Sequence, residues 1–252
     1  MTLLVSVKTK DGIVVASDSR ITRVRRMEKR ELLRKTTKIE ETFLSDSGNK
    51  LFLTKGGVAI AIAGNLRSEK ISLFNELTRF SDENDEKDTV KVAKSVLELL
   101  KRTVRYGTVG IVAGYSDKDG GKDGCICLLD VEKDDVSIAD GKDCFATYLG
   151  EAMPITLMSE LARLGKGNHM GEGFQFSLFT LQDAVDFCCF AIRTTEQHLR
   201  FTYGYNTVGG NVDVVLITPS GSRWLRRSEP TLDDGLLTLE NITVDNWEVG
   251  ST

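Results

Sequence analysis

The chain begins with MTLLVSVKTKDGIVVASDSR (residues 1–20), and this stretch decides the fold class. Its apolar-rich runs at Leu3–Thr9 and Ile13–Ser19 have the length and the β-branched content of strands. Between the two runs, Asp11-Gly12 is a dipeptide typical of tight hairpin turns. The sequence therefore predicts that the first residues are paired in a sheet, although chain ends are commonly frayed.

The composition argues against several classes of protein and site. With 252 residues, 40% apolar and 28% charged, the chain can bury an ordinary hydrophobic core. Its formal charge of -4 argues against a chain that binds nucleic acid as a whole. The five cysteines form no CxxC pair and the two histidines have no metal-ligand spacing. We therefore expect no metal site.

The sequence also bears on location. No apolar run reaches the length of a membrane span, and no apolar signal segment precedes the first strand. An odd number of cysteines is typical of a reducing compartment. We therefore expect a cytoplasmic protein that has no membrane partner.

Strands and helices are predicted to alternate in blocks along the rest of the chain. Apolar runs bounded by glycine or acidic turns predict strands, and apolar residues at helical spacing, such as Leu73 and Leu77, predict amphipathic helices. Further strands are expected at Leu51–Thr54, Val58–Ala63, Thr108–Ser116, Cys125–Val131, Val136–Ile138, Phe145–Leu149, Asn211–Thr218 and Arg223–Arg226. Helices are expected at Asn65–Ser81, Asp88–Tyr106, Ala152–Leu164 and Thr180–Glu196.

The order of these blocks predicts an α+β fold. Strands, a helix pair, strands, a second helix pair and final strands suit two antiparallel sheets packed face to face with helices on both outer faces, a four-layer αββα sandwich. Sheets buried on both faces explain the continuous apolar runs VAIAIA (58–63) and VVLI (214–217). Because no repeat or linker is evident, we expect a single domain over residues 1–252, with a polar C-terminal tail from about residue 228.

One stretch is unusually basic. RVRRMEKRELLRKTTK (residues 23–38) carries eight basic residues and two acidic ones. Such a cluster can bind an acidic partner or a polyanion, but a run of charges is more commonly a solvated loop or short helix. We expect the solvated loop or short helix here.

Thr2 has the most distinctive chemistry in the first hairpin. If the hairpin turns about the aspartate of its turn, antiparallel pairing sets Thr2 opposite Arg20 and Leu4 opposite Asp18. A one-residue slip would reverse the faces but keep the chain end near both charges. Removal of Met1, which a small second residue permits, would leave an amine and a hydroxyl on Thr2. An α-amine with a pKa of about 7.7–8.0 can accept the hydroxyl proton near neutral pH.

Three blocks of sequence resemble the proteasome-type N-terminal-nucleophile hydrolases, which include proteasome β subunits and their bacterial homologues. The blocks are TLLVSVKTKDGIVVASDSR (2–20), NKLFLTKGGVAIAIAG (49–64) and VGGNVDVVLITPSG (208–221). The resemblance covers most of the chain in element order. It implies that Thr2 is the nucleophile with its own amine as the base, that Asp18 and Lys50 form a buried ion pair behind it, and that the Gly64 N–H stabilises the oxyanion.

The resemblance also implies roles in substrate binding. Arg20 matches a structural arginine, and Thr22 matches a residue that pairs with the substrate backbone as an added strand. Phe52, Ile62 and Leu66 would line an apolar pocket for the residue before the cut.

Three positions depart from the family pattern. An accessory aspartate and serine of active members fall on Tyr205 and Val208, and a second serine falls on Leu149. These groups orient the amine and a water in the family, so the proton path is incomplete unless Thr207 or Asn206 substitutes for them.

Three functions remain open. The first is a threonine peptidase that forms homo-oligomeric stacked rings, cuts polypeptides through an acyl ester and needs no cofactor; whether an ATP-dependent unfoldase feeds it is open. The second is a catalytically impaired proteasome-like scaffold or binding subunit. The third is a small-amide hydrolase, because fold does not fix substrate. The motifs GxSxG, HExxH and the Walker loop do not occur in the sequence.

We predict that Met1 is absent from the mature protein, because Thr2 can act as its own base only with a free amine. Intact-mass spectrometry of the purified protein should give the mass of residues 2–252. A protein that retains Met1 would have a blocked amine, and this result would favour the scaffold over the peptidase.

Overall fold

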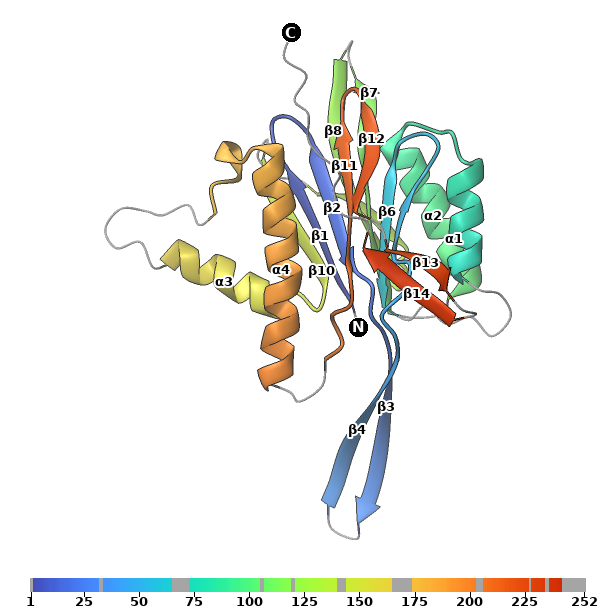
Figure 1. Cartoon of the computed structure of the whole chain (residues 1–252), viewed down its shortest axis with the longest axis vertical. Coiled ribbons are helices and arrows are strands. Elements are labelled where there is room, and N and C mark those ends of the chain that lie inside the picture. Colours follow the sequence, from blue (N-terminus) through green and yellow to red (C-terminus); the bar gives the residue numbers. More distant parts are fainter. Residues whose placement is uncertain are drawn as a thin grey trace.

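The computed structural model describes residues 2–31, 34–64, 73–104, 107–118, 121–139, 144–164, 174–202, 206–226, 228–233 and 236–241. Within these residues, two five-stranded antiparallel sheets and four α-helices form the body of the molecule (Figure 1). This composition of elements agrees with the predicted α+β class.

The first sheet has the strand order β10-β1-β2-β11-β12 and the second has the order β5-β6-β7-β8-β9. The strands of the first sheet are β1 (Leu3–Lys8), β2 (Ile13–Asp18), β10 (Phe145–Gly150), β11 (Val212–Thr218) and β12 (Gly221–Arg226). Those of the second are β5 (Leu51–Leu53), β6 (Ala59–Gly64), β7 (Thr108–Lys118), β8 (Gly121–Asp130) and β9 (Asp135–Ile138). All ten were expected from the sequence, although several bounds differ.

The helices pack on the two sheets in pairs. The helices are α1 (Leu73–Glu83), α2 (Thr89–Thr103), α3 (Met153–Leu164) and α4 (Leu181–Thr202), and a short 3-10 helix spans Phe176–Leu178. Apolar residues of α1 and α2 share a buried cluster with the second sheet, whereas α4 shares another with the first sheet. Helix α4 extends six residues beyond the predicted end at Glu196. The predicted helical residues 65–72 and 105–106 lie outside the described residues.

A third buried cluster lies between the two sheets, and the alternation of small and large residues along β6 suits this position. Ala59, Ala61 and Ala63 lie in the cluster between the sheets, whereas Ile60 and Ile62 lie in the cluster beneath α1 and α2. Because successive side chains of a strand point to opposite faces, AIAIA places small residues toward the other sheet and large ones toward the helices. Both faces are therefore apolar and the run is continuous, as predicted.

The predicted register of the first hairpin was wrong by one residue. Leu4 pairs with Ser17 and not with Asp18. The reason is the turn, in which the Thr9 N–H donates to the Gly12 carbonyl at 2.8 Å and leaves a two-residue loop between them. Alternation from Leu4, which lies in the cluster between the sheets, places Thr2 on that same face.

The basic stretch is a hairpin and not the loop or short helix that we expected. β3 (Ile21–Glu31) pairs with β4 (Arg34–Ser45) to form a separate two-stranded sheet. Figure 1 shows this sheet, here called the arm, extending away from the body. The density of charge concealed the strand signal, because the β-branched residues Val24, Thr36 and Ile39 are separated by lysines, arginines and glutamates.

Two further observations complete the fold. The segment expected to be a polar tail contains a second small hairpin, β13 (Ser228–Asp233) with β14 (Leu236–Asn241). No helix among the described residues is both long and apolar enough to cross a membrane.

Candidate active site

The carboxylate of Asp18 lies at the centre of the candidate site. Asp18 ends β2 and is fully buried. One of its oxygens, Oδ1, accepts the backbone N–H of Leu3 at 3.1 Å. The other, Oδ2, accepts the N–H of Gly209 at 3.1 Å and the Lys50 ammonium at 3.0 Å. One side chain thus joins the first strand, the segment before β5 and the segment before β11.

Lys50 provides a buried positive charge at this point. Its side chain is 1% exposed, and its Nζ also donates to the backbone oxygen of Arg20 at 2.5 Å. Its own carbonyl accepts the Ile62 N–H at 2.9 Å, which fixes the segment before β5 against β6. The structure therefore brings Asp18 and Lys50 together as a buried ion pair.

Burial is the largest influence on both members of this pair. Burial raises the pKa of Asp18, and the Lys50 cation and the N–H groups of Gly209 and Leu3 oppose that increase. Burial lowers the pKa of Lys50, and the carboxylates of Asp18 and Asp213 oppose that decrease. Because taking two charges out of water costs more than most ion pairs return, an apolar pair would stabilise the fold at least as well. Stability alone therefore gives no reason for the two buried charges.

Thr2 is held next to this ion pair. The N–H that Asp18 accepts belongs to the peptide bond between Thr2 and Leu3. The Thr2 carbonyl accepts the N–H of Glu151 at 2.8 Å, and Thr2 is only 3% exposed. Gly150 has a φ of +88°, and a Cβ there would collide with the Thr2 carbonyl. The end of β10 therefore fixes the backbone of Thr2 from the opposite side.

Gly64 ends β6 beside Lys50. N–H groups alternate in direction along a strand, so the Gly64 N–H points to the same edge as the Ile62 N–H that Lys50 accepts. This edge faces Lys50 and not β7. Gly64 has a φ of +111°, and a Cβ there would collide with the Gly107 carbonyl. The backbone alone requires glycine at this position, whatever the N–H binds.

Arg20 connects the candidate site to the base of the arm. Its Nε and Nη2 donate to the two carboxylate oxygens of Asp46, at 2.6 and 3.1 Å. Asp46 directly follows β4, so this bidentate pair holds the base of the arm beside the candidate site. Thr22 lies at the start of β3, half-buried and paired with Phe43, where the arm leaves the body.

The predicted pocket residues are in a different environment from Thr2. Phe52 and Ile62 lie in the buried cluster beneath α1 and α2, whereas Leu4, on the face of Thr2, lies in the cluster between the sheets. The structure therefore does not bring Phe52 and Ile62 into one cluster with that face. Leu66 lies outside the described residues, and the role of all three in substrate binding stays a prediction.

Two buried polar residues were missed in the sequence analysis. Asp213 on β11 is 2% exposed and pairs with Ser17 on β2, which is fully buried. The Ser17 hydroxyl has no hydrogen-bond partner among the described residues. A signal for Asp213 was present, because an acidic residue within the apolar run of NVDVVLI is a buried charge that needs an explanation. No comparable signal existed for Ser17.

Of the three positions that depart from the family pattern, the two that the structure describes carry apolar side chains in apolar surroundings. Val208 is buried in the cluster under α4, and Leu149 packs against the cluster between the sheets. Thr207 is fully buried, and its hydroxyl has no partner among the described residues. Tyr205 lies outside the described residues. Thr207 therefore offers an uncommitted hydroxyl near Gly209, whereas Val208 and Leu149 offer no polar group.

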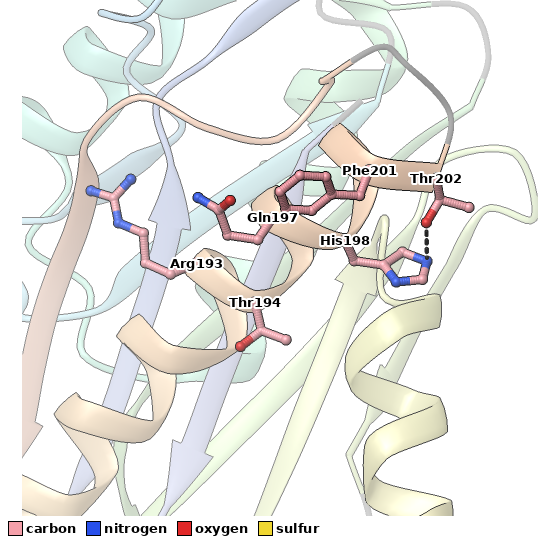
Figure 2. Close-up of a pocket in the computed structure, with 6 residues that line it drawn as sticks. All are labelled: Arg193, Thr194, Gln197, His198, Phe201 and Thr202. Carbon is pink, nitrogen blue, oxygen red and sulfur yellow. Dashed lines mark hydrogen bonds between the residues drawn. The ribbon is translucent and has the colours of Figure 1, made fainter.

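No cluster of metal-ligating side chains is found where the chain is described. No group of three or more His, Cys, Asp or Glu side chains there could hold a metal ion, and the five cysteines are free. An open hollow of about 490 Å³ lies on α4, lined by Arg193, Thr194, Gln197, His198, Phe201 and Thr202 (Figure 2). The Nε2 atom of His198 lies 3.4 Å from the Oγ1 atom of Thr202. None of these residues belongs to the candidate site around Asp18.

The comparisons with known proteins support the fold. No protein-family model and no curated protein matches the chain. Among solved structures, the chain is similar to a (Gly-1) mutant of Anbu from Hyphomicrobium sp. strain MC1, with a TM-score of 0.55 and 17% identity over 98% of this chain and 89% of that one. Anbu is a bacterial proteasome-like protein of the N-terminal-nucleophile type. At this identity, the likeness shows a proteasome-like fold and no activity.

We predict that Lys50→Met lowers the free energy of unfolding by about 3–5 kcal/mol, because it leaves the buried Asp18 carboxylate without its cation. Urea unfolding followed by circular dichroism measures this loss. Lys55→Met is the matched control, since Lys55 is exposed in the nearby turn and should change the free energy by less than about 0.5 kcal/mol. Equal losses in the two variants would contradict the ion pair.

Proposed function

We propose that the protein is a threonine-type peptidase whose nucleophile is the hydroxyl of Thr2. The observation that carries the proposal is the buried Asp18–Lys50 ion pair, in which Asp18 also accepts the N–H of the Thr2–Leu3 peptide bond. A cation held in this way beside a threonine that can become the chain end suits the activation of a hydroxyl. The proteasome-like fold supports this chemistry by analogy only.

The first chemical step follows from the charges around Thr2. Once Met1 has left, the Thr2 amine takes the proton of the Thr2 hydroxyl, and the oxygen attacks the carbonyl carbon of the peptide bond. The Lys50 ammonium disfavours a second positive charge on the amine, so the amine stays neutral and basic. The same cation stabilises negative charge on the attacking oxygen.

The remaining steps use the backbone and the same amine. The oxyanion of the tetrahedral intermediate accepts the Gly64 N–H, and a donor of this kind lowers the barrier by about 3 kcal/mol. The protonated amine then gives its proton to the leaving amine, and the C–N bond breaks. The acyl ester left on Thr2 is hydrolysed by water, which restores the hydroxyl and releases the acid.

The proposal extends to architecture and partners. The single domain would have the four-layer αββα arrangement of this class. Copies of the chain would assemble in stacked rings that enclose the sites and admit polypeptides in the cytoplasm.

Apolar side chains on α3 support contact between copies, because Met153, Leu157 and Leu161 are spaced four residues apart and are 39%, 52% and 65% exposed. An ATP-dependent unfoldase is a further partner of this proposal. We propose no nucleic-acid or membrane partner.

A specific observation favours a second candidate, the catalytically impaired scaffold. Val208 and Leu149 bring apolar side chains to the positions at which active members of the resembled family have serines. A scaffold would keep the fold and the ion pair without turnover. Chemical labelling of Thr2 separates the two candidates.

The test is incubation of the purified protein with an epoxyketone, which must bond both the amine and the hydroxyl of an N-terminal threonine. We expect a covalent adduct on Thr2 by peptide mass mapping, and none in Thr2→Ala. Thr9→Ala is a control for loss of a buried threonine elsewhere in the first hairpin, and it should still form the adduct.

Absence of an adduct in wild-type protein that lacks Met1 would contradict the proposal and favour the scaffold. An adduct without cleavage of any fluorogenic peptide would instead favour the small-amide hydrolase.

A further inference from the structure

Asp213 is a second buried carboxylate near the candidate site, and the mechanism above does not use it. It is 2% exposed within β11, whose other residues are apolar apart from the terminal Thr218. Burying a carboxylate costs several kcal/mol unless a cation or donors compensate it. Its negative charge acts on Lys50, whose pKa it raises. Asp213 therefore belongs to the electrostatic environment of the ion pair.

The registers of three neighbouring strands place Asp213 in a row with residues near Thr2. Asp213 pairs with Ser17, and Ser17 pairs with Leu4. Side chains directly opposite each other in such a row have Cβ atoms about 4.5–5.5 Å apart, and diagonal neighbours are about 7–8 Å apart. Thr2 is two residues from Leu4 on the same face, so Thr2 is the diagonal neighbour of Ser17.

The side chains of this row point into the layer between the two sheets. Val15, two residues from Ser17, and Val215, two residues from Asp213, both lie in the cluster between the sheets, as does Leu4. Alternation along each strand therefore turns Ser17, Asp213 and Thr2 toward the same layer.

Ser17 carries the second, independent observation. Its hydroxyl is fully buried and has no hydrogen-bond partner among the described residues. Buried hydroxyl groups in folded proteins nearly always have a partner, so an orphan of this kind indicates a group or a water that binds there. The amine that forms on Thr2 when Met1 leaves is such a group.

We infer that Asp213 and Ser17 are positioning residues for the liberated amine of Thr2. They would replace the accessory aspartate and serine, whose positions in the family pattern carry Tyr205 and Val208 here. The Ser17 oxygen accepts an N–H of the amine, directly or through one water, and the Asp213 carboxylate next to it in the row supplies a negative charge that attracts the amine. The amine lone pair then faces the Thr2 hydroxyl. This inference rests on the proposed function.

Other charged groups packed against β11 lie elsewhere. Arg223 and Arg226 on β12 pair with Leu216 and Val214, whose side chains lie in the cluster under α4. The α4 residues Arg193 and Glu196 belong to the helix that covers this same outer face of the sheet. At the Asp213 end of the row, the charges that act on Lys50 together with Asp213 are those of Asp18 and Arg20.

The test is the rate of epoxyketone adduct formation on Thr2 as a function of pH, in full-length protein processed at Met1. The rate should rise with pH as the amine loses its proton. Because the Asp213 anion favours the protonated amine, Asp213→Asn should lower the midpoint of this rise by about one pH unit. A purely structural role for Asp213 would leave the midpoint unchanged.

Ser17→Ala provides a second variant that removes no charge. We expect it to slow adduct formation by about tenfold to a hundredfold at the pH optimum, because the amine is no longer oriented. Ser6→Ala is the matched control, since the Ser6 hydroxyl is equally buried and unpartnered but lies farther along β1. It should react at the wild-type rate.

The outcomes separate this inference from the proposed function. A wild-type protein that forms no adduct contradicts the proposed function itself. A wild-type protein that reacts, with Ser17→Ala as fast as Ser6→Ala and an unshifted midpoint in Asp213→Asn, overturns this inference alone. Thermal unfolding checks that each variant is folded, and the comparison of Ser17 with Ser6 is decisive if Asp213→Asn does not fold.

Discussion

The structure depends on one buried carboxylate that several segments of the chain share. Asp18 accepts hydrogen bonds from Leu3, Lys50 and Gly209, which lie 15, 32 and 191 residues away in the sequence. These donors come from the start of the first sheet, from the segment that leads into the second sheet, and from the segment before β11. The same contacts therefore connect the Lys50 cation, through Asp18, to the N–H of the Thr2–Leu3 peptide bond.

The buried ion pair is energetically costly. Burial opposes the charged forms of both Asp18 and Lys50, so the pair stabilises the protein little compared with apolar side chains of the same size. The backbone near the pair requires glycine at two positions, since Gly64 and Gly150 are both at positive φ and a Cβ at either would collide with a neighbouring carbonyl. Buried charges with perturbed pKa values are common at functional sites, although structural ion pairs have them as well.

Much of this arrangement could be predicted, because it depends on local patterns. Apolar runs and glycine turns predicted the ten strands of the two sheets, and the resemblance around Asp18 and Lys50 predicted that the two side chains form a pair. The register of the first hairpin could not be predicted, since the Thr9–Gly12 hydrogen bond that sets it depends on turn geometry. The arm was missed because charge obscured its strand pattern. The Ser17–Asp213 pair could not be predicted, because it joins β2 to β11, which is distant from β2 in the sequence.

The central claim is that the Lys50 ammonium lies next to the Thr2 hydroxyl once Met1 has been removed. The distance between Lys50 Nζ and Thr2 Oγ1 in a crystal structure of the processed protein tests this claim most directly. We expect the two atoms to lie within hydrogen-bond distance, about 3 Å, with Asp18 still bound to Lys50. A Lys50 side chain that keeps Asp18 but lies beyond about 5 Å from Thr2 Oγ1 would contradict it.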